Sequence, residues 1–139
     1  MIDLICDVIE RAATCPLTGA ASALAWDLER RSIPCGYWLY ICDLDGLKSI
    51  NDTQGHLAGD AFIADSVASL RLIFRRQSDH IYRIGGDEFA IVSQCPPIVL
   101  DGVMLPFSIG SAMFSGDLDA AIRAADTQMY AEKRRRKSC

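Results

Sequence analysis

Two pairs of carboxylate side chains stand out in this 139-residue sequence, because each pair lies beside a short apolar run. Asp43 and Asp45 come directly after the apolar run 37–42, and Asp87 and Glu88 follow two consecutive glycines. Acidic groups fixed at strand ends, with main-chain oxygens between them, form a hard oxygen site suited to magnesium and substrate phosphates. Either pair alone would be interpreted as solvent-exposed acid. Together, beside glycines that admit a ligand close to the backbone, they favour a metal-dependent site.

Hydrophobic periodicity predicts the helices that hold these residues in place. Apolar residues between 63 and 74 recur at i, i+4, i+7 and i+11, which is one face of a long amphipathic helix. Further helices are predicted over residues 2–13 and 20–31 and from residue 117 onward. The stretch 43–60, which precedes the long helix, is polar.

Apolar runs without helical spacing predict the strands. The run 37–42 is rich in aromatic residues and is predicted to be a strand buried on both faces. Residues 81–84 and 89–92 are predicted to pair as a hairpin through Gly85-Gly86, because a tight turn requires the positive φ that glycine supplies.

A second hairpin is predicted over residues 98–105, turning at Asp101-Gly102, with a strand continuing over 105–109. Helices therefore alternate with at least two hairpins. This order predicts an α+β fold with an antiparallel or mixed sheet rather than a doubly wound parallel one.

Length and composition predict one compact domain, since half of the residues are hydrophobic and 23% are charged. The longest purely apolar run is too short to span a bilayer, and Asp3 and Asp7 interrupt the region where a signal peptide would be basic. The six cysteines are scattered without a CxxC pair, which predicts reduced thiols and no zinc site. We therefore expect a cytoplasmic protein with no membrane partner.

The net charge of −4 is distributed unevenly along the chain. Residues 1–129 carry nine basic and seventeen acidic side chains, whereas residues 130–139 carry five and one. A general nucleic-acid binder would present a basic face, so no nucleic-acid partner is expected. An acidic body with a basic tail suits a protein that holds magnesium with carboxylates and phosphates with the tail.

Residues 83–89, Arg-Ile-Gly-Gly-Asp-Glu-Phe, resemble the signature of the GGDEF domains, the diguanylate cyclase family. Residues 43–56 with Gly59-Asp60 are similar to that family's D-x-D-x-F-K-x-I-N-D-x-x-G-H-x-x-G-D segment. Three more segments resemble its L-T-G turn, its S-x-G strand and its A-D-x-A-M-Y-x-A-K helix: residues 16–19, 108–110 and 125–133. Five motifs in the family's order identify the chain as a member.

The resemblance implies a palm-like α+β fold with a mainly antiparallel sheet flanked by helices, related to the nucleotidyl cyclase palm. Residues 1–15 would form an N-terminal helix and residues 16–139 a single GGDEF domain. The implied activity is that of a bacterial signalling enzyme, in which two facing protomers condense two GTP into cyclic di-GMP and two pyrophosphates. The implied partners are GTP, cyclic di-GMP as product and inhibitor, and a second copy of the chain.

The resemblance also assigns the metal and the base. Asp43, the Leu44 carbonyl and Asp87 would hold magnesium, with manganese as an alternative. Glu88 would complete the acidic site as a metal ligand or as the base. The metal would neutralise the triphosphate and lower the pKa of the attacking 3′-hydroxyl.

Further residues are implied to bind the substrate. Asn51 and Asp60 would read guanine, because an amide and a carboxylate match its mixed acceptor and donor edge. The residues implied to contact GTP through side chains or bare backbone are Gly46, Leu47, Lys48, Gly85, Gly86, Lys133 and Lys137. Lys137 stands where the family usually has arginine, and it lacks the bidentate fork. Arg134 to Arg136 are interpreted as a solvent-exposed tail.

Arg76 and Asp79 match the family's R-x-x-D product-inhibition site, since five residues separate Asp79 from Gly85. The sequence departs from the family at Gly46 and Leu47, which replace bulky residues. It departs again over residues 93–107, where the family normally has an extra helix. That shortening is expected to affect one face of the sheet and none of the acidic or guanine-reading positions.

Two alternatives to an active cyclase follow from the same residues. One is a catalytically weak or silent GGDEF domain that binds GTP or cyclic di-GMP, the latter through Arg76 and Asp79. The other is a minimal palm nucleotidyltransferase that makes another cyclic nucleotide. The intact acidic signature favours the cyclase over the first, and Asn51 and Asp60 favour guanine over the second.

Overall fold

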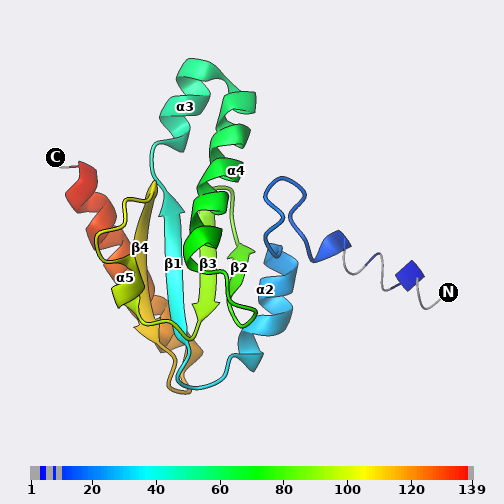
Figure 1. Cartoon of the computed structure of the whole chain (residues 1–139), viewed down its shortest axis with the longest axis vertical. Helices are drawn as coiled ribbons and strands as arrows, with labels where there is room; N and C mark the ends of the chain where they lie inside the picture. Colours follow the sequence, from blue (N-terminus) through cyan, green and yellow to red (C-terminus); the bar gives the residue numbers. More distant parts are fainter. Residues whose placement is uncertain (1–3, 6–7, 9–10, 138–139) are drawn as a thin grey trace.

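A four-stranded antiparallel sheet forms the centre of the protein in a computed structural model that describes residues 4, 5, 8 and 11–137 (Figure 1). The strands lie in the order β2-β3-β1-β4. Their bounds are Trp38–Leu44 for β1, His80–Arg83 for β2, Glu88–Ser93 for β3 and Phe107–Met113 for β4. The predicted α+β fold with a mainly antiparallel sheet is confirmed. Half of the residues of the helix predicted over 2–13 lie outside the described residues.

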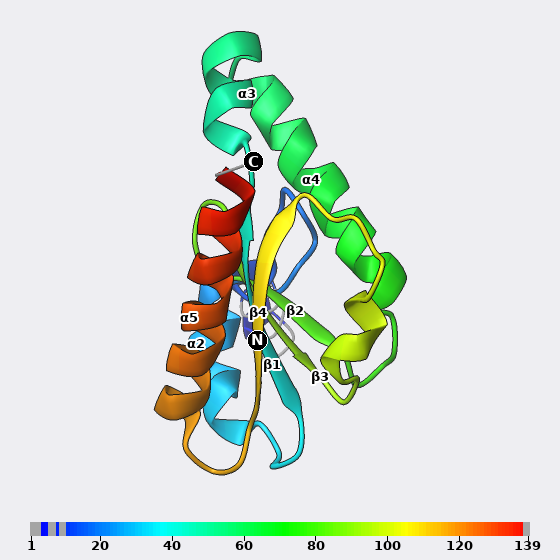
Figure 2. The ribbon, with the colours of Figure 1, turned by 90° about the vertical axis from the view of Figure 1, so that its left-hand side faces the viewer.

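Helices cover both faces of the sheet. The bounds of the helices are Ala23–Glu29 for α2, Leu47–Gln54 for α3, His56–Ile73 for α4 and Leu118–Lys137 for α5, with short 3-10 turns at Arg30–Ser32 (η1) and Pro97–Leu100 (η2). α4 packs on one face, and α2 and α5 pack on the other (Figure 2). α3 and the first turns of α4 extend beyond the end of the sheet at which β1 ends (Figure 1). No described helix is long and apolar enough to cross a lipid bilayer.

The central strand β1 is buried on both faces, as its apolar run predicts. Successive side chains of a strand point to opposite faces, so Tyr40 and Cys42 enter the core beneath α4, while Leu39 and Ile41 enter the core beneath α5 and α2. The strand continues two residues beyond the apolar run and takes Asp43 into the buried region, where it is 7% exposed. Burial of this carboxylate is the feature on which the site depends.

The helix α5 lies directly on the backbone of β4, because Gly110 has no side chain to hold it away. A Cβ built at Gly110 would lie 1.8 Å from the Ala125 carbonyl oxygen and 2.5 Å from the Met129 nitrogen. This contact explains why the S-x-G segment ends in glycine. It also fixes how far the following turn of α5 lies from the end of the sheet.

Three predicted features differ in the structure. The polar stretch 43–60 contains α3 and the start of α4, and the helix predicted from residue 20 begins at Ala23, where the Ser22 side chain accepts a hydrogen bond from the Ala25 amide. Gly85 and Gly86 are not among the glycines with positive φ, so that expectation is wrong. The connection has four residues, 84–87, and is closed by the Ile84 amide donating to the Glu88 carbonyl over 2.9 Å, so it does not need a two-residue turn.

The hairpin predicted over residues 98–105 is also wrong. Pro97–Leu100 form the 3-10 turn η2, a turn follows at Asp101-Gly102, and β4 begins only at Phe107. Pro97 lies at the first position of η2, where its fixed φ favours a helical turn, and Met104 is 94% exposed rather than buried on a sheet face. The shortened segment instead packs Val99, Leu100 and Leu105 against the core beneath α4.

Gly110→Ala should lower the free energy of unfolding by about 3 kcal/mol, since the added methyl overpacks the contact with α5. Urea denaturation measures this loss. Gly86→Ala is the matched control, because a Cβ there meets nothing within 4 Å. Equal stability of the two variants would contradict the close contact.

Candidate functional site

The two predicted acidic pairs meet at one end of the sheet. Asp43 in β1 lies opposite Glu88 in β3 in the strand register, and the Leu44 amide donates to the Asp87 carbonyl over 2.9 Å. Asp43 and Glu88 therefore share the face of the sheet that α5 covers. The structure brings together all four residues that the sequence assigned to the metal.

Lys133 on α5 supplies the positive charge at this end of the sheet. Its Nζ lies 3.0 Å from Asp43 Oδ2 and 4.0 Å from Asp45 Oδ1. The two partners of the shorter pair are 20% and 10% exposed, so solvent screens this ion pair only in part. The lysine assigned to substrate phosphates thus neutralises the buried carboxylate.

Burial and neighbouring carboxylates raise the pKa of two acidic groups in this cluster. Burial raises the pKa of Asp43, and the charge of Asp87 and a hydrogen bond with it act in the same direction, against the opposing effect of Lys133. Burial likewise raises the pKa of Glu88, and the charges of Asp43, Asp87 and Asp126 add to that effect. One ammonium group is therefore too little positive charge for this cluster.

The donor set fits a divalent ion that also binds phosphate. Asp43 Oδ1 is buried and has no hydrogen-bond partner, which leaves one carboxylate oxygen directed at no donor. Across residues 11–137 and the three described positions before them, no three His, Cys, Asp or Glu side chains form a metal-binding group. Magnesium commonly takes only one or two carboxylates from a protein and completes its shell with water and phosphate. Asp43, Asp87 and a main-chain oxygen meet that requirement.

The two residues predicted to read guanine lie on the projecting pair of helices. Asn51 of α3 lies against Gly59 of α4, so closely that a Cβ at Gly59 would be 1.8 Å from Asn51 Oδ1. Asp60 is the next residue along α4 and is exposed. Gly55 turns the chain between the helices with φ of +92°. The two glycines of this motif thus hold Asn51 against the residue that precedes Asp60.

The start of α3 presents main-chain groups next to the acidic cluster. Gly46 precedes the helix in a left-handed conformation, with φ of +82°, and has open space around its Cα. Leu47 packs against the core, while Lys48 is exposed. Free amides at a helix start bind anions, which agrees with the predicted contact to phosphate.

Arg136 is exposed, as predicted for residues 134–136, but its guanidinium is held by three partners that the sequence did not predict. Its Nη1 donates to Asp45 Oδ2 over 2.8 Å and to the Leu105 carbonyl over 3.2 Å, and its Nε donates to Glu132 over 3.1 Å. Lys137 is exposed at the end of the helix. Helical spacing carries the missed signal: Lys133 and Arg136 follow the buried Met129 by four and seven residues, on the face that packs on the sheet.

Arg83 is a second residue whose role the sequence did not predict. Its guanidinium donates to the carbonyls of Gly85 and Gly86, the shortest bond being 2.7 Å, and to Cys15 Sγ over 3.5 Å. Arg83 therefore holds the glycine loop against the turn at residues 15–18. Burial opposes ionisation of the Cys15 thiol, but hydrogen bonds from Thr18 and Arg83 outweigh it and lower the pKa to about 7.

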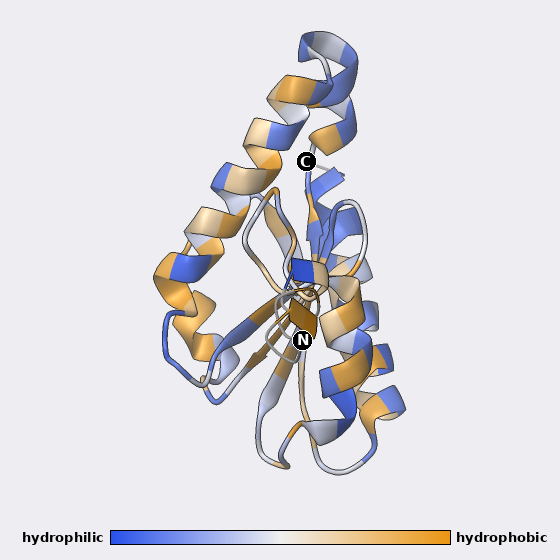
Figure 3. Ribbon diagram, turned by 90° about the vertical axis from the view of Figure 1, so that its right-hand side faces the viewer, coloured by the Kyte–Doolittle hydropathy of each residue, from blue (hydrophilic) through white to orange (hydrophobic). Residues whose placement is uncertain are grey.

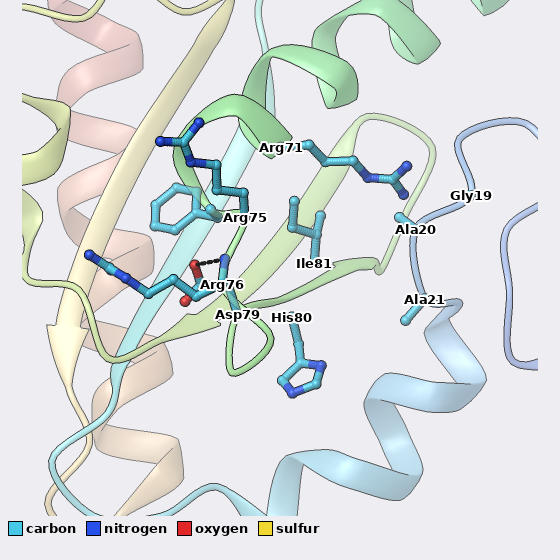
Figure 4. A pocket seen from close by; sticks show the side chains of 10 residues that line it. Gly19, Ala20, Ala21, Arg71, Arg75, Arg76, Asp79, His80 and Ile81 are labelled. Carbon is cyan, nitrogen blue, oxygen red and sulfur yellow. Dashed lines mark hydrogen bonds between the residues drawn. The ribbon is translucent and has the colours of Figure 1, made fainter.

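Arg76 and Asp79 lie at the other end of the β2–β3 pair from the acidic cluster. Asp79 Oδ2 accepts from the Arg76 main-chain amide over 3.1 Å, and Oδ1 accepts from Ser93 Oγ over 2.6 Å. A hollow of about 430 Å³ lies over this turn (Figure 4) and includes the side chains of Arg71, Arg75, Arg76 and His80. The predicted pair thus belongs to a basic surface hollow.

Comparison with known proteins agrees with this geometry. The family model described as "Diguanylate cyclase, GGDEF domain" matches residues 24–98, more than half of the chain, so the chain belongs to the GGDEF family. The match ends within the shortened segment 93–107.

Curated relatives include diguanylate cyclase DosC of Escherichia coli K12, 35% identical over 119 residues, covering 68% of this chain and 26% of DosC. The probable diguanylate cyclase DgcE of the same organism is 48% identical over 54 residues, covering 39% of this chain and 5% of DgcE. The chain spans about a quarter of the length of DosC.

Solved structures extend the likeness to most of the chain. A microbial GGDEF domain described with bis-(3′,5′)-cyclic di-GMP superposes with a TM-score of 0.69 at 31% identity, covering 88% of this chain and 93% of that one. The GGDEF domain of DgcB from Caulobacter crescentus, in complex with cyclic di-GMP, superposes with a TM-score of 0.74 at 25% identity, covering 88% and 91%.

Lys133→Met should lower the free energy of unfolding by about 2 kcal/mol at neutral pH, because it leaves Asp43 buried without its cation. The loss should shrink in acid: a carboxyl whose pKa is raised by folding destabilises the protein above that pKa and ceases to do so once protonated. Urea denaturation at pH 7 and pH 5 measures both effects. Arg135→Met, which removes the same charge from an exposed site, is the control. A loss independent of pH would contradict the pairing.

Proposed function

We propose that the chain is a magnesium-dependent diguanylate cyclase domain that joins two GTP molecules, one from each of two protomers, into cyclic di-GMP and two pyrophosphates. One observation carries this proposal: Asp43, Asp87 and Glu88 converge beside Lys133, with a carboxylate oxygen of Asp43 buried and unpartnered. Family membership supports it, as do relatives named diguanylate cyclase.

In each half-reaction, the 3′-hydroxyl oxygen of one GTP forms a bond to the α-phosphorus of the other. The bond between that phosphorus and the bridging oxygen breaks, and pyrophosphate leaves. Glu88 is suited to accept the hydroxyl proton, because its raised pKa makes it a stronger base than an ordinary carboxylate. A second reaction of the same kind closes the ring.

Asp43, the Leu44 carbonyl and Asp87 would hold the divalent ion, magnesium or manganese. When bound, this ion neutralises the triphosphate and lowers the pKa of the attacking hydroxyl. Lys133, which lies 3.0 Å from Asp43, would contact the β- and γ-phosphates from that position. Lys48 and Lys137, both exposed near the same end of the sheet, would add further positive charge.

Asn51 and Asp60 would select guanine over adenine. Guanine offers a carbonyl acceptor and an amino donor that an amide and a carboxylate can pair, whereas adenine leaves these groups poorly satisfied. The packing of Asn51 on Gly59 supports this role, because it restricts where the amide can lie.

The pure protein with magnesium should convert GTP, and not ATP, into cyclic di-GMP, as resolved by chromatography of the nucleotides. Glu88→Gln should lower the rate at least about 100-fold, since it removes the base and one acidic charge. Glu29→Gln is the matched control, because Glu29 is exposed on α2 and its amide can still accept from Tyr82. Specific activity should rise with protein concentration, since each protomer carries one substrate.

Three outcomes would contradict this proposal. Preferential turnover of ATP would favour a nucleotidyltransferase of another specificity. Cyclic di-GMP binding without turnover would favour a silent binding module. A flat specific activity over a dilution range in which sedimentation shows dissociation would exclude catalysis between two protomers.

A second proposed function is cyclic di-GMP binding in the basic hollow over Arg76 and Asp79, where three arginines suit the two phosphates of the ligand. Arg76→Ala should weaken binding by about tenfold or more in calorimetry. The turn should survive, because Asp79 accepts from the main-chain amide of Arg76 and not from its side chain. Arg31→Ala, an exposed arginine outside the hollow, should bind like the wild type. Equal affinities of the two variants would exclude cyclic di-GMP binding in this hollow.

A further inference from the structure

The guanidinium of Arg136 connects three segments that are distant in sequence. It reaches Glu132 on its own helix, Asp45 after β1, and the Leu105 carbonyl before β4. The Asp45 amide also donates to the Pro106 carbonyl over 2.9 Å. The C-terminal turns of α5 lie at the end of the sheet from which α3 departs (Figure 2), and they are strongly hydrophilic (Figure 3). Arg136 therefore lies beside the acidic cluster.

Asp45 has defined partners for both carboxylate oxygens. Oδ2 accepts from Arg136 over 2.8 Å, and Oδ1 accepts from Ser108 Oγ over 2.8 Å. Lys133 Nζ lies 4.0 Å from Asp45 but 3.0 Å from Asp43. A single ammonium group thus lies between two carboxylates and pairs closely with only one of them.

Arg136 accounts for that preference. Two carboxylates near one lysine compete for it, and the one already neutralised by another cation competes less well. With Arg136 in place, Asp45 is compensated and Lys133 remains with Asp43. Without Arg136, Asp45 would draw the ammonium group toward itself and away from the position at which phosphates are expected.

We propose that Arg136 is a positioning residue for nucleotide binding: it neutralises Asp45, and so keeps Lys133 at Asp43 and available to the phosphates of GTP. This inference rests on the proposed function, because it concerns the same nucleotide site. It assigns Arg136 no contact with the substrate. Its effect passes through Asp45 and Lys133 alone.

Arg136→Met tests this directly. The KM for GTP should rise about fivefold, because a partly exposed ion pair contributes about 1 kcal/mol and that energy corresponds to about a fivefold change. The kcat should change by less than about twofold. The affinity for a non-hydrolysable GTP analogue with magnesium, measured by calorimetry, should fall by the same factor. Arg135→Met is the matched control, since it removes an equal charge from the neighbouring residue, whose ion pair is with Glu132.

A double variant separates positioning from simple stabilisation. Asp45→Asn combined with Arg136→Met removes the competing carboxylate together with its cation, so the KM should return to within about twofold of the wild type. If Arg136 merely stabilised this end of α5, the double variant would not recover the KM. It would still lack the hydrogen bonds that Ser108 makes to the Asp45 carboxylate and that the Leu105 carbonyl accepts from Arg136. Arg136→Lys should keep the KM close to that of the wild type, since the inference requires a positive charge at this position and not the bidentate geometry of a guanidinium.

The outcomes distinguish this inference from the function on which it rests. If the wild type makes cyclic di-GMP but Arg136→Met and Arg135→Met share one KM and one analogue affinity, the positioning role is excluded and the cyclase stands. Failure of the double variant to recover excludes the route through Asp45. If the wild type neither turns over nor binds GTP, both proposals are overturned together.

Discussion

The ion pair between Asp43 and Lys133 is the interaction on which the end of the sheet depends. β1 takes a carboxylate into a buried position directly opposite Glu88, and Asp87 lies beside both. A buried carboxylate without a cation costs several kcal/mol in an ordinary protein interior. The lysine on α5 offsets that cost. The acidic cluster carries more negative charge than Lys133 can neutralise, and this excess is the basis of its proposed affinity for a divalent ion. The same charges therefore affect both the stability of the protein and its proposed function.

Two close backbone contacts determine the distances within which these charges act. α5 rests on the main chain of β4 at Gly110, and Lys133 follows one helical turn after Met129, which touches that contact. α4 receives the side chain of Asn51 at Gly59. Neither glycine is needed for a positive φ. Both are needed because a single methyl group would separate the packed elements, α5 from β4 and α4 from Asn51 of α3.

The sequence could predict the elements and the site membership because local patterns determine both. The run 37–42 lacks polar residues and had to be a buried strand, and the apolar spacing over 63–74 had to be one face of a helix. The first acidic pair lies at the end of β1 and the second at the start of β3, and these two strands pair antiparallel, so the pairs meet. The turn between β2 and β3 was harder to predict. Two glycines suggested a tight hairpin turn, but the connection has four residues and is held by Arg83, so neither glycine has a positive φ. Pro97, at the start of η2, favours a helical turn over the strand predicted from residue 98, despite the hairpin signal at Asp101-Gly102.

What no local pattern could reveal is the balance of charge between remote segments. Asp45 and Arg136 are 91 residues apart, and only the packing of α5 on β4 brings them together. The segment 93–107 contributes to both the core and the site: the Leu105 carbonyl accepts from Arg136, and the Pro106 carbonyl accepts from the Asp45 amide. Its apolar residues pack on the α4 face of the sheet, whereas Asp43 and Glu88 share the α5 face. The apolar side chains of this segment therefore support the core beneath α4, while Arg136 and Asp45 depend on its main-chain carbonyls and on the contact between α5 and β4.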